Sequence, residues 1–125
     1  MAPDLKRIVV LVDKPDGHFD PDEEDFEVIL SEDLDISDSR WFHFKYTILE
    51  LSTAVKPYVA SRIFERSGVD RLLYFDPDIE IYCDLHRLLA SLDEHTLVLT
   101  PHLTCPIEDE CRPSDLDILR SGSYN

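Results

Sequence analysis

The apolar positions along the chain fall into short runs that are typical of β-strands. Residues 8–12 form a β-branched run that ends at Asp13, and this run predicts a buried strand. Residues 26–30 alternate well enough to favour a second strand. The same criteria predict three further strands, at residues 71–75, 79–82 and 96–100.

Between residues 40 and 50, aromatic and aliphatic residues recur at helical spacing. The pattern predicts one helix that buries Trp41, Phe44, Ile48 and Leu51 along one side. An alternative is a sugar-stacking platform built from the aromatic side chains, which are Trp41, Phe42, Phe44 and Tyr46. Because aromatic residues at this spacing more often belong to a core, we expect them to be core residues.

A second helix is predicted to begin at Lys56-Pro57, because proline is tolerated in the first turn of a helix. Val55, Val59 and Ile63 fall on one stripe of this helix, which we expect to face the core. Gly68 should end the helix, because glycine is the residue most often found after a last helical turn.

Two shorter helices are predicted in the last third of the chain. Asp84 is placed to cap a helix over residues 85–92, and Ser114 to cap a final helix near residues 115–120. Strands that alternate with helices indicate an α/β fold. We therefore expect a mostly parallel, open sheet of four or five strands with flanking helices.

The length and charge of the chain limit its function. With 125 residues, a single domain is expected. Twelve Lys and Arg against 27 Asp and Glu give a net charge of −15, which argues against nucleic-acid binding. The apolar runs are too short to span a membrane and no signal peptide is evident, so a cytoplasmic location is expected. The three cysteines favour reduced thiols over a disulfide framework.

Two aspartates interrupt the apolar pattern directly after residues 71–75. Asp76 and Asp78 flank Pro77, whose fixed φ stiffens a turn from which both carboxylates can face one point. In open parallel sheets, ligands bind beyond the carboxyl ends of the strands. Two carboxylates there suit Mg²⁺ or Mn²⁺, which keep water ligands and bind phosphate oxygens of a substrate. The alternative is an ordinary turn with two solvated aspartates.

The segment LLYFDPDIEIYCDL resembles the metal-binding Asp-x-Asp segment of GT-A-fold glycosyltransferases. Upstream, ELSTAVKPYVASRIFERSGVDRLLYFD is similar to the helix that precedes this motif in the family-8-like bacterial group. Downstream, DEHTLVLTPHL and SDLDILRSGSYN resemble that group's next strand and its approach to an Asn-x-Gly-Phe segment. The resemblance extends from about residue 8 to the end of the chain.

This resemblance implies a metal-dependent glycosyltransferase that moves a sugar from a nucleotide-diphosphate donor to an unknown acceptor. Asp76 and Asp78 match the family's ligands for Mn²⁺ or Mg²⁺ and for the diphosphate. Lys56 matches a basic residue that contacts the donor, and Asn125 matches the start of the segment that lines the sugar pocket. The resemblance assigns no catalytic residue.

The resemblance also carries an expectation about the domain. Residues 1–125 would form one incomplete GT-A, Rossmann-like donor-binding domain. This domain would lack the family's first strand-helix element and its C-terminal acceptor half.

Two other functions and two other sites compete with this interpretation. The chain could be a non-catalytic acidic remnant or binding module, or a phosphotransferase with Asp76 as nucleophile, although such enzymes usually carry a hydroxyl residue shortly after the pair. A calcium loop at residues 13–24 is disfavoured, because Pro15 and Gly17 stand where ligands are needed. A zinc site in which His102, Cys105 and Cys111 join His95 is disfavoured by its spacing.

Overall fold

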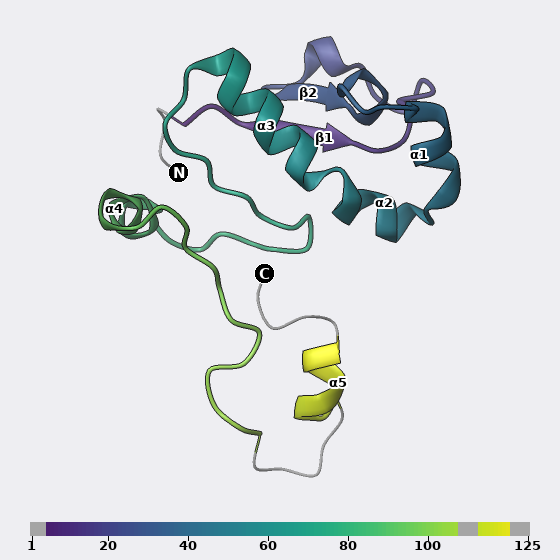
Figure 1. Ribbon diagram of the computed structural model, residues 1–125. Coiled ribbons are helices and arrows are strands. Elements are labelled where there is room, and N and C mark those ends of the chain that lie inside the picture. The colour runs from purple at the N-terminus through teal and green to yellow at the C-terminus, as the bar shows by residue number, and fades with distance from the viewer. Residues whose placement is uncertain (1–4, 108–112, 121–125) are drawn as a thin grey trace. The chain divides into compact units, whose positions relative to one another are not determined.

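The computed structural model describes residues 5–107 and 113–120 of the chain (Figure 1). The described residues fall into two compact units, one ending at Cys83 and the other starting at Asp84. The first unit contains all the described strands and three α-helices, and the second contains two short α-helices.

The first unit is built on a two-stranded parallel sheet. β1 (Ile8–Leu11) pairs with β2 (Glu27–Leu30) in a register that sets Ile8 opposite Glu27 and Leu11 opposite Leu30. Two 3₁₀ turns, η1 (Pro21–Glu23) and η2 (Ser31–Asp33), stand before and after β2. The predicted strands at residues 8–12 and 26–30 are thus confirmed, as is the α/β class.

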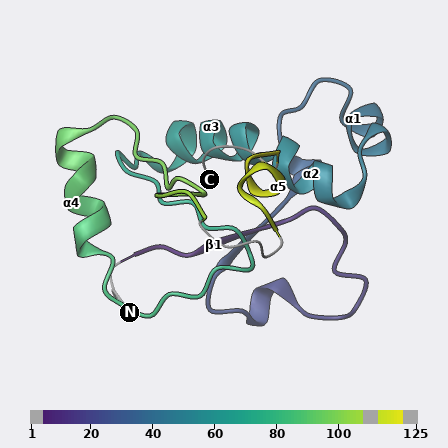
Figure 2. The same cartoon turned by 90° about the horizontal axis from the view of Figure 1, so that it is seen from below.

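Helix α3 (Lys56–Ser67) packs on this sheet through the stripe predicted from the sequence (Figures 1 and 2). Val55, Val59 and Ile63 retain only 3%, 7% and 6% of their accessible surface. The helix ends at Gly68, whose φ of 60° lies in the left-handed region that glycine enters at little cost.

The core of the unit joins this stripe to residues from β2, the segment after it and the first two helices. Its other buried members are Ile29, Leu34, Ile36, Phe42 and Leu51. Val69 and Leu72 pack against the same cluster. The chain that leads to the Asp76 turn is therefore anchored to the core.

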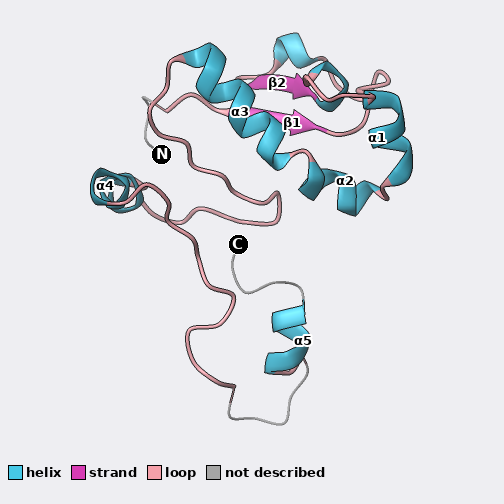
Figure 3. Cartoon of the chain, viewed as in Figure 1, coloured by secondary structure: helices cyan, strands magenta, loops and turns pink. Residues whose placement is uncertain are grey.

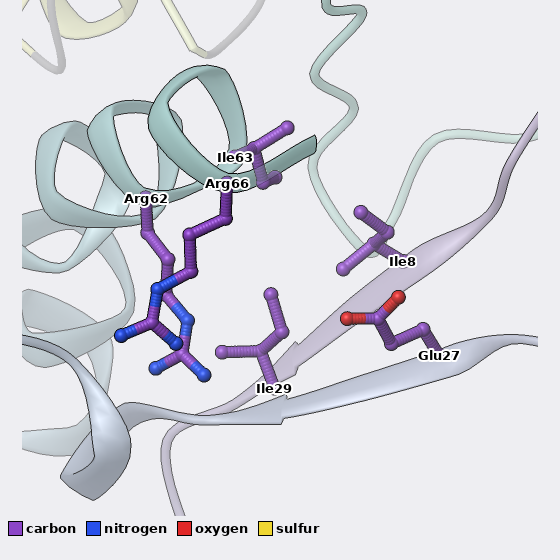
Figure 4. A pocket seen from close by; sticks show the side chains of 6 residues that line it. All are labelled: Ile8, Glu27, Ile29, Arg62, Ile63 and Arg66. Carbon is purple, nitrogen blue, oxygen red and sulfur yellow. The ribbon is translucent and has the colours of Figure 1, made fainter. Parts of the chain in front are cut away.

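Two arginines extend from α3 toward β2 and line a pocket between the helix and the sheet (Figure 4). Arg62 and Arg66 extend beside Ile29 of the strand, and Glu27 lies on the other side of Ile29. The Arg62 guanidinium donates a hydrogen bond to the carbonyl oxygen of Asp33 in η2. These side chains cover the edge of the apolar contact between helix and strand.

The helix predicted over residues 40–50 is two helices, α1 (Ser39–Lys45) and α2 (Ile48–Ala54). Tyr46 has extended backbone angles, and Thr47 begins α2 with a capping box. In this box the Thr47 hydroxyl accepts from the Glu50 N–H at 3.4 Å, and the Glu50 carboxylate accepts from the Thr47 N–H at 2.9 Å. The box favours a new helix start over continuation.

This break makes the predicted burial of the first apolar stripe largely wrong. Leu51 is buried at 5% exposure, but Trp41, Phe44 and Ile48 are exposed at 57%, 78% and 63%. Phe42 takes the core position instead, where its ring makes edge contacts with Tyr46 and Tyr58. The reason is that two helices with separate axes do not share one buried face.

The strands predicted at residues 71–75, 79–82 and 96–100 are not formed (Figure 3). Among the described residues, the one sheet contains β1 and β2 alone, not the four or five strands expected. An apolar run becomes a strand only where a neighbouring chain pairs with its backbone N–H and C=O groups, and these three runs have no such partner in the described sheet.

The second unit contains α4 (His86–Glu94) and α5 (Asp115–Arg120). The Asp84 carboxylate accepts a hydrogen bond from the His86 N–H at 2.7 Å, which satisfies one free donor at the start of α4. At α5, the Ser114 hydroxyl accepts from the Asp117 N–H, and the Asp117 carboxylate accepts from the Ser114 N–H. Both helix starts follow the sequence prediction to within a residue or two. Within the described residues, no helix has the length and apolar character needed to cross a bilayer.

Candidate functional site

The two aspartates of the Asp-x-Asp motif belong to one tight turn in the first unit. Asp76 is its first residue and Asp78 its third. The Ile79 N–H donates to the carbonyl oxygen of Asp76 at 3.0 Å, which closes the turn around Pro77 and Asp78. Proline is favoured at the second position of such a turn because its φ is already set. The turn predicted from the sequence is therefore formed, although the segment before it is not a strand.

The Asp76 carboxylate is held by two side chains. The Lys56 ammonium lies 2.8 Å from Oδ1, and the Tyr74 hydroxyl donates to the same oxygen at 3.0 Å. The Lys56 ammonium also lies 4.6 Å from the centre of the Tyr74 ring, within range of a cation–π interaction. The side chains of Lys56 and Asp76 are 29% and 21% exposed to solvent.

This arrangement links two elements that are separated by 20 residues in the sequence. Lys56 is the first residue of α3, and Asp76 lies in the loop that follows this helix. The structure therefore brings together two of the residues that the sequence analysis assigned to one donor site.

The contacts shift the pKa values of both partners of Asp76. Burial by itself lowers the pKa of the Lys56 ammonium, but the hydrogen bond and charge of Asp76, together with Tyr74, outweigh it, so that the net pKa is raised. The pKa of the Tyr74 hydroxyl is raised by burial and by its hydrogen bond to Asp76. At neutral pH, Lys56 is thus a fixed cation and Tyr74 a neutral hydrogen-bond donor.

The tetrapeptide Phe-Asp-Pro-Asp occurs twice in the chain, at residues 19–22 and 75–78. Both copies form the same backbone turn, because the Glu23 N–H donates to the Asp20 carbonyl at 3.1 Å just as Ile79 does to Asp76. In the first copy, the exposed Asp20 carboxylate accepts from the backbone N–H of Asp22 at 3.0 Å. The first copy is an ordinary solvated turn, whereas the second presents its carboxylate to a lysine.

Asp78 is exposed, and the described residues form no hydrogen bond or ion pair with its side chain. Asp76 and Asp78 fit a hard divalent cation in their donor chemistry, since both provide carboxylate oxygens and Mg²⁺ often takes only one or two protein carboxylates. In the described part of the chain, no three His, Cys, Asp or Glu side chains are grouped so that they could hold a metal ion. Mg²⁺ commonly completes its coordination with water and with phosphate oxygens of a substrate.

Two of the remaining sequence candidates cannot be placed. Asn125 lies outside the described residues, as does Cys111. In the proposed calcium loop, Asp13 and Asp20 accept hydrogen bonds from the backbone of Lys14 and Asp22. Cys83 and Cys105 are free, exposed thiols.

Sequence analysis did not identify Tyr74 as part of the site. A usable signal was present, because residues two apart in an extended segment point to the same side. Tyr74 and Asp76 have this spacing, and Tyr74 breaks the aliphatic pattern of the run with a hydroxyl group.

The chain matches no protein-family model, and no characterised protein or solved structure is significantly similar to it.

Proposed function

We propose that the chain is the donor-binding part of a GT-A glycosyltransferase that takes a sugar from a nucleotide-diphosphate donor. The observation that carries the proposal is the 2.8 Å contact between Lys56 and Asp76. It joins the two kinds of group that a diphosphate site needs, a fixed cation and a carboxylate able to hold a divalent ion. In the tetrapeptide at residues 19–22, the Asp20 carboxylate accepts instead from the backbone of Asp22, and no described lysine pairs with it, so the contact is not a property of the turn itself.

In this proposal, Asp76 and Asp78 hold Mn²⁺ or Mg²⁺ at the corner of the turn. An ion held there would supply charge neutralisation for the leaving diphosphate. Lys56, the first residue of α3, would add a positive charge beside the diphosphate. Its raised pKa means that desolvation beside Asp76 does not remove this charge. Tyr74 orients the Asp76 carboxylate through its hydrogen bond to Oδ1. The acceptor and the sugar are not specified by these residues.

The proposal is tested by calorimetric titration of the full chain with Mn²⁺ and then with uridine or guanosine diphosphate. We expect nucleotide binding that depends on the metal. Asp78→Asn should weaken metal-dependent binding at least about tenfold, which corresponds to about 1.4 kcal/mol.

The repeated tetrapeptide supplies a matched control for the many acidic residues of this chain. Asp22→Asn changes the equivalent, equally exposed aspartate of residues 19–22 and should leave binding unchanged. Equal losses in the two variants would show that the metal binds the acidic surface in general. Absence of metal-dependent nucleotide binding in the parent chain would overturn the proposal and favour a non-catalytic binding module.

A further inference from the structure

The exposed aromatic residues of α1 line a recess of about 400 Å³ in the first unit. Trp41 and Phe44 form its apolar part, with ring centres 5.6 Å apart and ring planes inclined by 30°. Their exposure of 57% and 78% is not a sign of a loosely placed helix, because Phe42 between them is buried in the core. α1 therefore presents two aromatic rings at the surface from a backbone that is anchored to the core.

Two charged residues complete the lining of the recess, namely Asp38 and Arg40. Within the described residues, neither side chain forms a hydrogen bond or ion pair. An unpaired arginine is unexpected in a chain of net charge −15, where carboxylates are abundant. Both groups are therefore able to bond to a ligand in the recess.

The conformation of Asp38 supports the same conclusion. Asp38 is the N-cap of α1, but its carboxylate does not accept from the helix N–H groups as an N-cap aspartate normally does. Its backbone lies in the left-handed region, with φ 51° and ψ 52°, which is uncommon for a residue with a side chain. The Asp38 carboxylate is therefore not used to cap α1 and is available to a ligand.

We propose that this recess, lined by Asp38, Arg40, Trp41 and Phe44, binds the pyranose ring of a neutral saccharide. A pyranose has an apolar C–H face, which suits the electron-rich faces of the two rings. Its hydroxyl groups both donate and accept, so a carboxylate that accepts and a guanidinium that donates can bind neighbouring hydroxyls. An aromatic pocket with a few placed polar groups is the usual form of a small-ligand site.

Other ligand classes fit the lining less well. A phosphate or other anion would meet the Asp38 carboxylate, and a cation would meet the Arg40 guanidinium. A purely apolar ligand would leave both charged groups without partners, at a cost in desolvation. The inference holds whether or not Asp76 and Asp78 bind a metal ion, since neither lines this recess.

The single tryptophan of the chain allows a direct test, because Trp41 is itself in the recess. Its fluorescence is followed while the full chain is titrated, without metal or nucleotide, with the methyl pyranosides of glucose, galactose, mannose and N-acetylglucosamine. We expect a saturable change with at least one of them and a Kd on the order of 1 mM, as is typical of so small a ligand. Sorbitol, which has the hydroxyls but no ring, should give no saturable change.

Variants separate the apolar and polar contributions. Phe44→Ala should weaken binding at least about fivefold, whereas Leu49→Ala, which removes an equally exposed side chain from α2, should not. Asp38→Gly and Arg40→Ala should each weaken it too, and glycine tolerates the left-handed backbone at position 38. No saturable change with any of the four pyranosides overturns the proposal. So does binding of cyclohexanol that is as tight as pyranoside binding and persists in Arg40→Ala, which would mark the recess as merely apolar.

Discussion

Asp20 and Asp76 begin the same turn in the same tetrapeptide, but their carboxylates have different partners. Asp20 accepts from the backbone two residues later, as aspartate often does at a turn. The Asp76 carboxylate accepts hydrogen bonds from the side chains of Lys56 and Tyr74. An ion pair that is mostly shielded from solvent contributes more than one on an open surface, because water screens it less. The tetrapeptide is the same in both copies, so the difference comes from residues outside it, namely Lys56 at the start of α3 and Tyr74.

The raised pKa of Lys56 leads to a prediction about stability at high pH. A group whose pKa is higher in the folded than in the unfolded chain stabilises the fold below its unfolded pKa, about 10.4 for lysine, and loses this effect as the pH rises through the folded pKa. Lys56→Met should lower the free energy of unfolding by about 1 to 2 kcal/mol at pH 7. The difference from the parent chain should shrink above about pH 10.5.

Urea unfolding at pH 7 and pH 11 measures this difference. Lys14→Met is the control, since Lys14 is 65% exposed and lies 3.9 Å from Glu32 in a loose surface pair, so its effect should be small at both pH values. A Lys56→Met effect that is the same at both pH values would contradict the proposed role of the ion pair.

At the scale of the elements, helix boundaries in this chain are set by single residues. Thr47 starts α2 only two residues after α1 ends, because its hydroxyl and the Glu50 carboxylate satisfy backbone groups that would otherwise be unpaired. Gly68 ends α3 by turning into the left-handed region. The break between α1 and α2 exposes the aromatic residues of α1, and the end of α3 sends the chain back toward Lys56.

Gly68→Ala isolates the conformational requirement at the end of α3. A Cβ atom at this position would meet nothing within 4 Å, so that the substitution introduces backbone strain without a steric clash. We expect a loss of about 1 kcal/mol in the free energy of unfolding, measured by urea denaturation. Gly68→Asn should lose less, because asparagine enters the left-handed region more easily. Equal losses for alanine and asparagine would argue against strain as the cause.

At the scale of the whole molecule, one apolar cluster in the first unit links β2, α1, α2 and α3. Leu49 and Leu51 lie two residues apart on α2 and point in different directions. Leu51 is 5% exposed and belongs to this cluster, whereas Leu49 is 78% exposed. Stability should depend on the first and not on the second, although the two residues are chemically identical.

Leu51→Ala should therefore destabilise the chain by about 2 to 5 kcal/mol, because it removes buried methyl groups and leaves a cavity. Leu49→Ala should change stability by less than about 0.5 kcal/mol. Far-ultraviolet circular dichroism in urea measures both. Similar losses in the two variants would show that α2 does not pack in the orientation described.

The candidate site could be predicted only in part. The Asp76-Pro77-Asp78 turn follows from proline chemistry within four residues, and a lysine for the site came from family resemblance and not from local pattern. The choice of Asp76 as the aspartate that Lys56 contacts was not anticipated, because it depends on where α3 places its first residue. Tyr74 was also missed, although its position two residues before Asp76 was a local signal for its contact. The recess of α1 was missed for a similar reason, since helical spacing alone could not show that Trp41 and Phe44 face outward.

The sequence by itself determined β1, β2, the buried stripe of α3 and its end at Gly68, because each depends on side-chain periodicity or on the backbone of one residue. Tertiary structure alone decided which apolar runs became strands, since pairing needs a neighbouring chain that no local pattern supplies. It also decided that Asp76 meets a lysine while Asp20 does not. Contacts between residues far apart in the chain depend on the packing of whole elements. Two identical tetrapeptides therefore cannot determine by themselves which aspartate contacts a lysine.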